Sequence, residues 1–319
     1  MGPLTSTLNR PATEDVLSQS LRTVILLAGS VRQGRLGTQI GRPIFDLPVE
    51  NNRTILDLWR RQTQLLGERI GRLDLSVRVM IDRAAPPPVA EAYPLASGTA
   101  SVQIERDPLD YRGTGGVLRD VAGTYDDTDI LLVANAAQVL MEDLAELTLE
   151  MAEMKGDVTI ISHSDGTPSG LLLVRCRALR DVPETGFIDM KEQALPMIAL
   201  RHRVAVLERK SPVALPVLIL ADYITALRRY SKLRAGEHGV PGPFDEDWES
   251  SIAIVESGAD VHPTARLHDA VVLKGGRVEA DAVLANSLVC PGGVLKRKQM
   301  ATDALISPSG AAGKRGERS

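Results

Sequence analysis

Two glycine-containing segments carry the residue types that could bind a phosphate or a nucleotide. The first, Ala28-Gly29-Ser30, leaves a predicted buried strand with small residues, and Arg35 follows it. Exposed backbone N–H groups at such a turn, together with arginine, bind phosphate oxygens. The alternative is that Gly29, Gly34 and Gly37 only turn a loop whose arginines are solvated.

The second segment is Gly113-Thr114-Gly115-Gly116, which precedes a predicted short helix. Without side chains at three of these four positions, a nucleobase could approach the backbone closely. A glycine cluster is equally typical of a plain turn. Its order, with Glu105-x-x-Pro108-Leu109 upstream and an apolar strand downstream, favours a nucleotide pocket.

Together these segments resemble the sugar-phosphate nucleotidyltransferases, which include the NDP-sugar synthases and pyrophosphorylases. Residues 27–36 resemble a lengthened form of that family's Leu-Ala-Gly-Gly-x-Gly-Thr-Arg-Leu loop, and residues 42–49 resemble its Lys-Pro-x-x-x-x-Pro-Val segment. Residues 113–116 match its Gly-Thr-Ala-Gly segment, and the resemblance extends over residues 21–295.

The resemblance implies a set of site residues. Arg35 takes the place of the catalytic arginine, and Arg42 replaces a lysine, which keeps the charge but broadens the donor group. Gly170, in Pro168-Ser169-Gly170, takes the place of a glycine on the sugar side. The implied nucleotide contacts are Ala28, Gly29, Ser30, Gly113, Thr114, Gly115, Gly116 and Asn135.

The carboxylates that would hold Mg²⁺ in this family are missing. The predicted strand 130–134 ends in Asn135-Ala136-Ala137 where the family has Asn-Gly-Asp, and Pro216 stands where a second Asp would stand. Nucleotidyl transfer depends on Mg²⁺ held by carboxylates. We therefore predict no metal site and no certain cofactor. Asp222 is expected to cap a helix.

The segment that would bind the sugar is also shorter than in the family. Only His163-Ser164-Asp165-Gly166-Thr167 joins two predicted strands where the family has a hairpin and a Glu-Lys-Pro motif. Three consecutive residues cannot form a nucleophilic triad, so a turn is expected here. His262 and His268 are expected on different faces of a repeat domain.

The expected fold is α/β, with a Rossmann-like, mostly parallel sheet that has helices on both faces. Strands are predicted at residues 23–28, 75–81, 101–105, 130–134 and 157–162, the first of them buried and the second with alternating apolar residues. Helical spacing is predicted for residues 54–62, 116–121, 141–154 and 223–232. Ligands of such sheets lie at the carboxyl ends of the strands.

A short left-handed parallel β-helix is expected at the C-terminal end of the sequence. Apolar residues recur nearly every six positions, at Val261, Leu267, Leu273, Val278, Leu284 and Cys290. The expected organisation is a flexible leader (1–20), the α/β domain (21–234), a linker (235–250), the hexapeptide β-helix (251–296) and a disordered tail (297–319).

The composition argues against several classes of protein. The chain has 319 residues, 44% of them hydrophobic, and a formal net charge of −4, which gives no reason to expect nucleic-acid binding. Its two cysteines indicate neither a disulfide framework nor a zinc site. No membrane span is expected, and the cytoplasm is the expected compartment.

Three functions follow as hypotheses. The first is a catalytically impaired nucleotidyltransferase-like protein, a pseudoenzyme, that binds a nucleotide or NDP-sugar in a regulatory or assembly role. The second is an active NDP-sugar synthase that uses Mg²⁺ held by carboxylates such as Asp165, Glu142 or Asp143 and releases pyrophosphate. The third is a structural subunit of a homologous enzyme. A homo-oligomer, or a hetero-oligomer with a homologue, is the expected assembly.

Overall fold

The computed structural model describes residues 10–29, 35–50, 53–83, 85, 100–107, 112–235 and 251–312. The chain forms two compact units that do not follow the expected boundaries. The first unit comprises residues 1–33, 56–136 and 142–214, and the second comprises residues 34–55, 137–141 and 215–319. Three segments of the expected α/β domain therefore belong to the same unit as the β-helix.

The first unit contains a seven-stranded, mostly parallel sheet, which confirms the predicted fold class. Its strand order is β10-β8-β9-β6-β1-β4-β5, and β9 is antiparallel to both neighbours. The strands are β1 (Leu21–Ala28), β4 (Ser76–Ile81), β5 (Val102–Arg106), β6 (Ile130–Asn135), β8 (Val158–His163), β9 (Pro168–Arg175) and β10 (Val204–Arg209).

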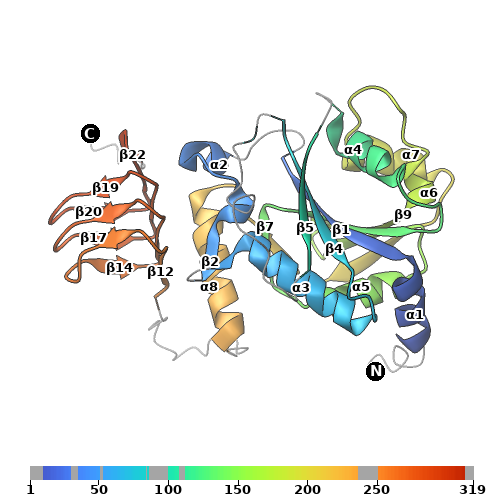
Figure 1. The fold of residues 1–319 in the computed structure, drawn as a ribbon, viewed down its shortest axis with the longest axis horizontal. Coiled ribbons are helices and arrows are strands. Elements are labelled where there is room, and N and C mark those ends of the chain that lie inside the picture. Colours follow the sequence, from blue (N-terminus) through green and yellow to red (C-terminus); the bar gives the residue numbers. More distant parts are fainter. Residues whose placement is uncertain are drawn as a thin grey trace. The chain divides into compact units, whose positions relative to one another are not determined.

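Helices cover both faces of this sheet (Figure 1). On one face lie α4 (Gly113–Ala122), α6 (Cys176–Leu179), the π-helical η3 (Met190–Ala194) and α7 (Leu195–Ala199). On the other lie α1 (Arg10–Ser20), α3 (Ile55–Arg69) and α5 (Leu144–Glu153). The predicted helices at residues 54–62, 116–121 and 141–154 are confirmed as α3, α4 and α5.

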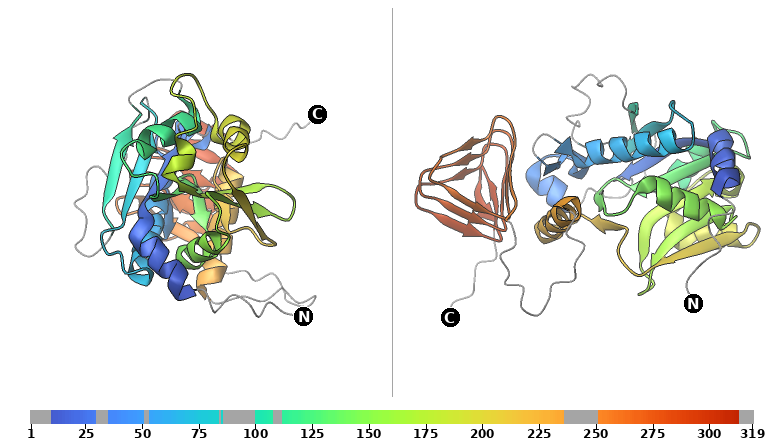
Figure 2. Two further views of the ribbon diagram at one scale, coloured as in Figure 1. Left: turned by 90° about the vertical axis from the view of Figure 1, so that its right-hand side faces the viewer. Right: turned by 90° about the horizontal axis from the view of Figure 1, so that it is seen from below.

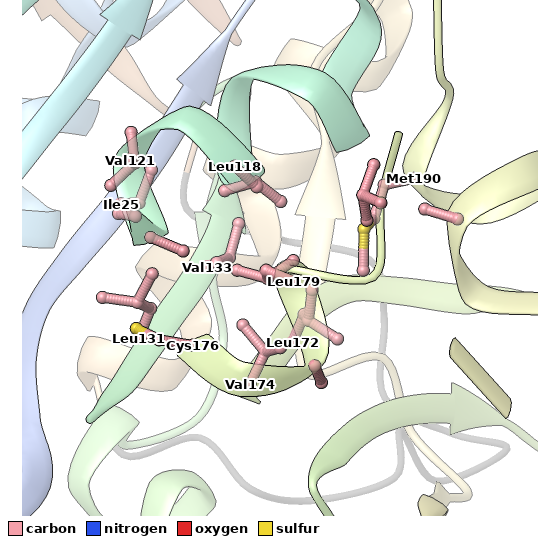
Figure 3. Close-up of a cluster of buried hydrophobic side chains, with 14 of the residues drawn as sticks. Ile25, Leu118, Val121, Leu131, Val133, Leu172, Val174, Cys176, Leu179 and Met190 are labelled. Atoms are coloured by element: carbon pink, nitrogen blue, oxygen red, sulfur yellow. The ribbon is translucent and has the colours of Figure 1, made fainter. Parts of the chain in front are cut away.

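The core under α4 explains why this helix forms where it does. Leu118 and Val121, one turn apart on α4, pack on side chains from β1, β6 and β9 (Figure 3). Every residue of β6 from Ile130 to Ala134 is buried, as a central strand covered on both faces requires. The helix between β5 and β6 is thereby fixed against the sheet.

The prediction of a flexible leader is wrong for residues 10–20, which form α1. Leu17 on this helix is fully buried. Two ion pairs join the helix to other parts of the unit, Arg10 to Glu146 at 2.9 Å and Glu14 to Arg69 at 2.9 Å. The polar sequence does not indicate this helix, because one buried leucine and ion pairs to distant residues stabilise it. Residues 1–9 lie outside the described part of the chain.

The second unit combines three short segments with the β-helix. The segments contain α2 (Arg35–Ile40), the 3₁₀ helix η1 (Ile44–Asp46), β2 (Pro48–Glu50), β3 (Arg53–Thr54), β7 (Gln138–Leu140), β11 (Ala214–Pro216) and α8 (Leu220–Ala235). Strands β7 and β11 pair with each other. The expected linker lies almost wholly at residues 236–250, outside the described residues.

Residues 253–312 form a parallel β-helix with three sheets (Figures 1 and 2). Its strands are β12 (Ala253–Val255), β13 (Asp260–Val261), β14 (Arg266–His268), β15 (Ala270–Val272), β16 (Arg277–Val278), β17 (Val283–Ala285), β18 (Leu288–Val289), β19 (Val294–Leu295), β20 (Met300–Thr302), β21 (Leu305–Ser307) and β22 (Gly310–Ala312).

Each coil of the β-helix contains 17 residues, the separation that joins Ser287 to Ala304 through a hydrogen bond. Val272, Val278 and Leu284 belong to its core, so two sides of a coil are six residues apart and one is five. Leu273 and Cys290, predicted to point inward, are buried but lie next to the core residues Val272 and Val289.

The prediction of a disordered tail is wrong for residues 297–312. Strands β20 and β21 continue the sheets, and β22 pairs antiparallel with β21. Ala301 and Ile306 extend the core of the β-helix beyond the expected end at residue 296. The basic run Lys296-Arg297-Lys298 forms an exposed corner, where Lys298 has φ +60°.

None of the helices in the described ranges is both long enough and apolar enough to cross a membrane.

Candidate nucleotide site

The strand ends that the sequence assigns to a nucleotide lie side by side in the first unit. Leu27 of β1 is in register with Asn135 of β6, and the N–H of Ala136 donates to the carbonyl of Leu27 at 3.0 Å. Ala28 and Gly29 therefore leave the sheet next to exposed Asn135. Gly29 has φ +104°, a conformation that glycine adopts without strain. Ser30 lies outside the described residues.

Helix α4 begins at the same edge of the sheet, because it returns from the end of β5 to the start of the parallel strand β6. Its glycines, however, approach the chain itself. A Cβ on Gly113 would lie 2.4 Å from the carbonyl oxygen of Ile188, and one on Gly115 would lie 3.0 Å from it. Gly115 also donates its N–H to that oxygen at 2.8 Å. Packing against Ile188 therefore explains both glycines.

The other two positions of this segment are also engaged within the unit. The Thr114 hydroxyl accepts from the N–H of Met190 at 2.8 Å and lies 3.2 Å from Asp189 Oδ2. A Cβ on Gly116 would meet the side chain of Arg112 at 3.3 Å. Arg112 donates two hydrogen bonds to Asp120, at 2.6 and 2.8 Å. The start of α4 is thus a rigid, preformed feature of the edge.

The two positions that the resemblance assigns to metal ligands meet in the second unit. The carbonyl of Ala137 accepts a hydrogen bond of 2.8 Å from the N–H of Val217, the residue after Pro216. The backbones at these two positions are therefore close to each other, and their side chains are a methyl group and a proline ring.

The carboxylates that an active enzyme could use instead of the missing metal ligands are bound to other groups of the chain. Asp143 caps α5 by accepting from the N–H groups of Ala145 and Glu146. Glu142 pairs with Arg209 at 3.6 Å. Across the described ranges, no three His, Cys, Asp or Glu side chains gather as a metal site.

Asp165 belongs to a turn, as predicted for residues 163–167. It accepts from the N–H and hydroxyl of Thr167 at 2.9 and 2.6 Å, and Gly166 has φ +81°. The hydrogen bonds from Thr167 lower the pKa of Asp165. The turn joins β8 and β9 directly, so this position carries no larger hairpin.

Gly170, the predicted sugar contact, lies in β9 with φ +79°, where the pairing of β8 with β9 shifts register. The positive φ at this bulge is itself a reason for glycine. Its role toward a sugar stays a prediction.

Arg42 lies in the second unit and binds a carboxylate of the β-helix. Its Nη1 and Nη2 donate to Glu256 Oε2 and Oε1 at 2.9 and 2.8 Å. Arg35 opens α2 in the same unit. The catalytic roles assigned to both arginines stay predictions. The family segments that assign a role to Arg42 contain no residue that corresponds to Glu256.

Asp222 caps a helix, as predicted, although from inside its first turn. Helix α8 begins at Leu220, two residues after Leu218 and one after Ile219, and both preceding N–H groups donate to Asp222 Oδ2 at 3.1 Å. The carboxylate thus satisfies donors that a helix start leaves open.

Comparisons with known proteins give structural similarity at low sequence identity. No family model matches the sequence, and no curated protein sequence matches it. A Mycobacterium sp. strain JC1 homologue of Mycobacterium tuberculosis rv0371c is 16% identical, with a TM-score of 0.45 over 67% of this chain and 98% of that one. HddC from Yersinia pseudotuberculosis is 14% identical, with a TM-score of 0.48 over 66% and 99%. The structure of HddC with GMP-PN gives 15%, 0.47, 66% and 99%.

Proposed function

We propose that the chain is a sugar-phosphate nucleotidyltransferase-like protein that binds a nucleotide or NDP-sugar and has lost most of the family's catalytic power. One observation carries the proposal. Ala137 and the segment that begins at Pro216 converge through the hydrogen bond from Val217, as two metal-binding positions must, yet neither supplies a carboxylate. The proximity of the two backbones supports descent from a metal-dependent enzyme, and the missing carboxylates support the loss of its metal site.

The binding half of the proposal is supported by the carboxyl edge of the sheet in the first unit. Ala28, Gly29 and Asn135 lie at neighbouring strand ends, and α4 begins at this edge. Ligands of parallel sheets bind at such edges. Polar atoms of Asn135 and backbone N–H groups are suitable partners for a nucleotide.

The proposed loss of catalytic rate follows from what a metal ion contributes to the reaction. Stabilisation of transition-state charge by a metal ion is worth several kcal/mol. A loss of about 4 kcal/mol slows a reaction roughly a thousandfold, at about 1.4 kcal/mol for each factor of ten. The alternative of an active Mg²⁺ enzyme would need new ligands, and Asp143, Asp165 and Glu142 have the partners described above.

Isothermal titration with ATP, CTP, GTP and UTP, and with the matching NDP-glucoses, tests the binding half. We expect at least one of them to bind, with a dissociation constant that changes less than about twofold between Mg²⁺ and EDTA. The Asn135→Ala variant should bind about tenfold more weakly, which corresponds to the loss of one buried polar contact. Gln103→Ala, which removes an exposed amide from the middle of β5, is the matched control.

Two results would refute parts of the proposal. The absence of heat with every ligand would remove the binding half. Release of pyrophosphate from a nucleoside triphosphate and a sugar 1-phosphate, at a rate ordinary for such enzymes, would remove the impairment and favour the active alternative.

A further inference from the structure

A β-turn follows strand β4 at the carboxyl edge of the sheet in the first unit. The N–H of Ala85 donates to the carbonyl of Asp82 at 3.0 Å, which closes the turn. Strand β4 lies between β1 and β5 (Figure 1). Ile81, the last residue of β4, is in register with Ala28 of β1. The turn therefore leaves the sheet beside Gly29, which has φ +104°.

One arginine holds this turn in place. Arg106 Nη1 lies 3.5, 3.3 and 3.0 Å from the carbonyl oxygens of Asp82, Arg83 and Ala85. Arg106 is the last residue of β5, and the next residue, Asp107, donates its N–H to the carbonyl of Ile81 at 3.0 Å. Hydrogen bonds from a charged donor are roughly twice as strong as those between neutral groups. The backbone of the turn is thus fixed relative to β4 and β5.

The side chain of Arg83 points its charge away from these contacts. Arg83 occupies the second position of the turn and is exposed. Its guanidinium has no ion pair or hydrogen bond with any of the described residues. Two other arginines at the carboxyl edge donate to carboxylates of the chain, Arg112 to Asp120 at 2.6 Å and Arg209 to Glu150 at 2.6 Å. Among these arginines, Arg83 is the one whose donors remain open to a ligand.

The charges around the turn favour an anion that accepts directed hydrogen bonds. Asp82 and Asp107 follow β4 and β5, next to Arg83 and Arg106, so this part of the edge has no excess of positive charge. General electrostatic attraction is therefore weak here. A guanidinium donates two parallel N–H bonds to the oxygens of a phosphate group. The phosphates are the anionic part of a nucleotide, so they are the part that such a donor binds.

We propose that Arg83 binds the phosphate groups of the nucleotide, and that Arg106 is a positioning residue that holds the turn from which Arg83 projects. This inference rests on the proposed function and adds the group that recognises the phosphates. Because the turn is formed before the ligand arrives, binding does not have to order its backbone, and the affinity gains accordingly.

The test is isothermal titration of the full chain, in EDTA, with the nucleoside triphosphate that the wild type binds and with its nucleoside. Arg83→Gln should weaken binding of the triphosphate about tenfold or more, which is the loss of a charge-assisted contact, and should change binding of the nucleoside less than about twofold. Arg83→Lys keeps the charge without the fork and should fall in between. Arg61→Gln is the matched control, because Arg61 is exposed in the middle of α3. This control should bind both ligands as the wild type does.

Variants of Arg106 test the positioning role. Arg106→Gln should weaken binding of the triphosphate about threefold and leave the nucleoside unaffected, whereas Arg106→Lys, which keeps a charged donor, should weaken it less. Because Arg106 acts through Arg83, the double variant Arg83→Gln, Arg106→Gln should bind the triphosphate no more weakly than Arg83→Gln alone. A merely structural role predicts equal weakening for both ligands or a further loss in the double variant. Either result would remove Arg106 from the inference.

Titration with sodium tripolyphosphate separates the inference from the proposed function. If the wild type binds a nucleotide and Arg83→Gln binds it equally well, the inference fails and the proposed function stands. If the wild type binds tripolyphosphate but no nucleotide, loss of that binding in Arg83→Gln supports the phosphate site and refutes the proposed function. Tripolyphosphate binding that Arg83→Gln retains would then refute both. If the wild type binds neither ligand, both fail.

Discussion

The carbonyl of Ala137 and the N–H of Val217 form a 2.8 Å hydrogen bond. This bond joins the residue before β7 to the residue after Pro216, both in the second unit. It leads to the first prediction, that carboxylates introduced at these positions can bind one metal ion.

The double change Ala137→Asp and Pro216→Asp should create a Mn²⁺ or Mg²⁺ site, since carboxylate oxygens are the ligands that these ions prefer. We expect Mn²⁺ to bind about tenfold more tightly, or better, than it binds the wild type, as measured by the electron paramagnetic resonance signal of free Mn²⁺. Each single change supplies one ligand and should give a smaller gain. Unchanged affinity in the double variant would show that the two side chains do not converge.

Gly113 should prove to be a packing residue. Gly113→Ala places a Cβ 2.4 Å from the Ile188 carbonyl oxygen and also strains a backbone with φ +69°. Gly166→Ala is the matched control, because φ is +81° there and nothing lies within 4 Å of the new Cβ. We expect the control to lose about 1 kcal/mol of unfolding free energy from strain alone. Gly113→Ala should lose about 2 kcal/mol more from the overlap. Equal losses in urea denaturation would assign Gly113 no packing role.

The last coil should contribute to stability. Ile306 is 2% exposed and Met300 is 71% exposed, although they lie in strands β21 and β20, which follow one another in the sequence. Ile306→Ser removes buried apolar surface and buries a hydroxyl, so it should cost about 3 kcal/mol. Met300→Ser should change the stability by less than about 0.5 kcal/mol. Similar thermal unfolding of the two variants would contradict the described core.

Asp269 should make the second unit sensitive to acid. Burial raises the pKa of its carboxyl, but hydrogen bonds from Arg228 and from the N–H of Ile252 outweigh burial and lower it below 3.8. Because the folded pKa is the lower one, the stabilisation is present above the unfolded pKa and is lost as the pH falls through the folded value.

Asp269→Asn removes this titration while suiting the positive φ of +48° at this corner. Urea unfolding at pH 7 should show the wild type to be more stable than the variant, and the difference should shrink as the pH falls below about 4. Asp260→Asn, on an exposed strand, should show no such convergence. A difference that stays constant down to pH 3 would refute the assignment.

The sheet of the first unit could be predicted because some of its strands contain continuous apolar runs and others alternate apolar with polar residues. Residues 130–134, for example, are buried on both faces. The β-helix was harder to place in register. In β15, Ala270, Val271 and Val272 are all buried, so apolar character does not mark which of them points inward. This is why Leu273 was predicted where Val272 belongs.

The candidate site was predictable only in part, because sequence identifies positions and not their partners. The sequence indicated that position 113 must lack a side chain. It did not indicate that Ile188 occupies the space where that side chain would lie. No local pattern joins Arg42 to Glu256, since they meet only through the tertiary structure of the second unit. The absent carboxylates at Ala137 and Pro216 were visible because a family pattern specifies those positions.

The coil of 17 residues restricts how this protein can change in length. Stacked side chains such as Asp260 and Arg277, or Leu288 and Leu305, keep their partners only if an insertion or deletion spans a whole coil. A change of one residue would turn the inward side chains of the affected strand outward. Genetic variation in the length of residues 253–312 should therefore occur in steps of one complete coil, or at corners where an added residue projects into solvent.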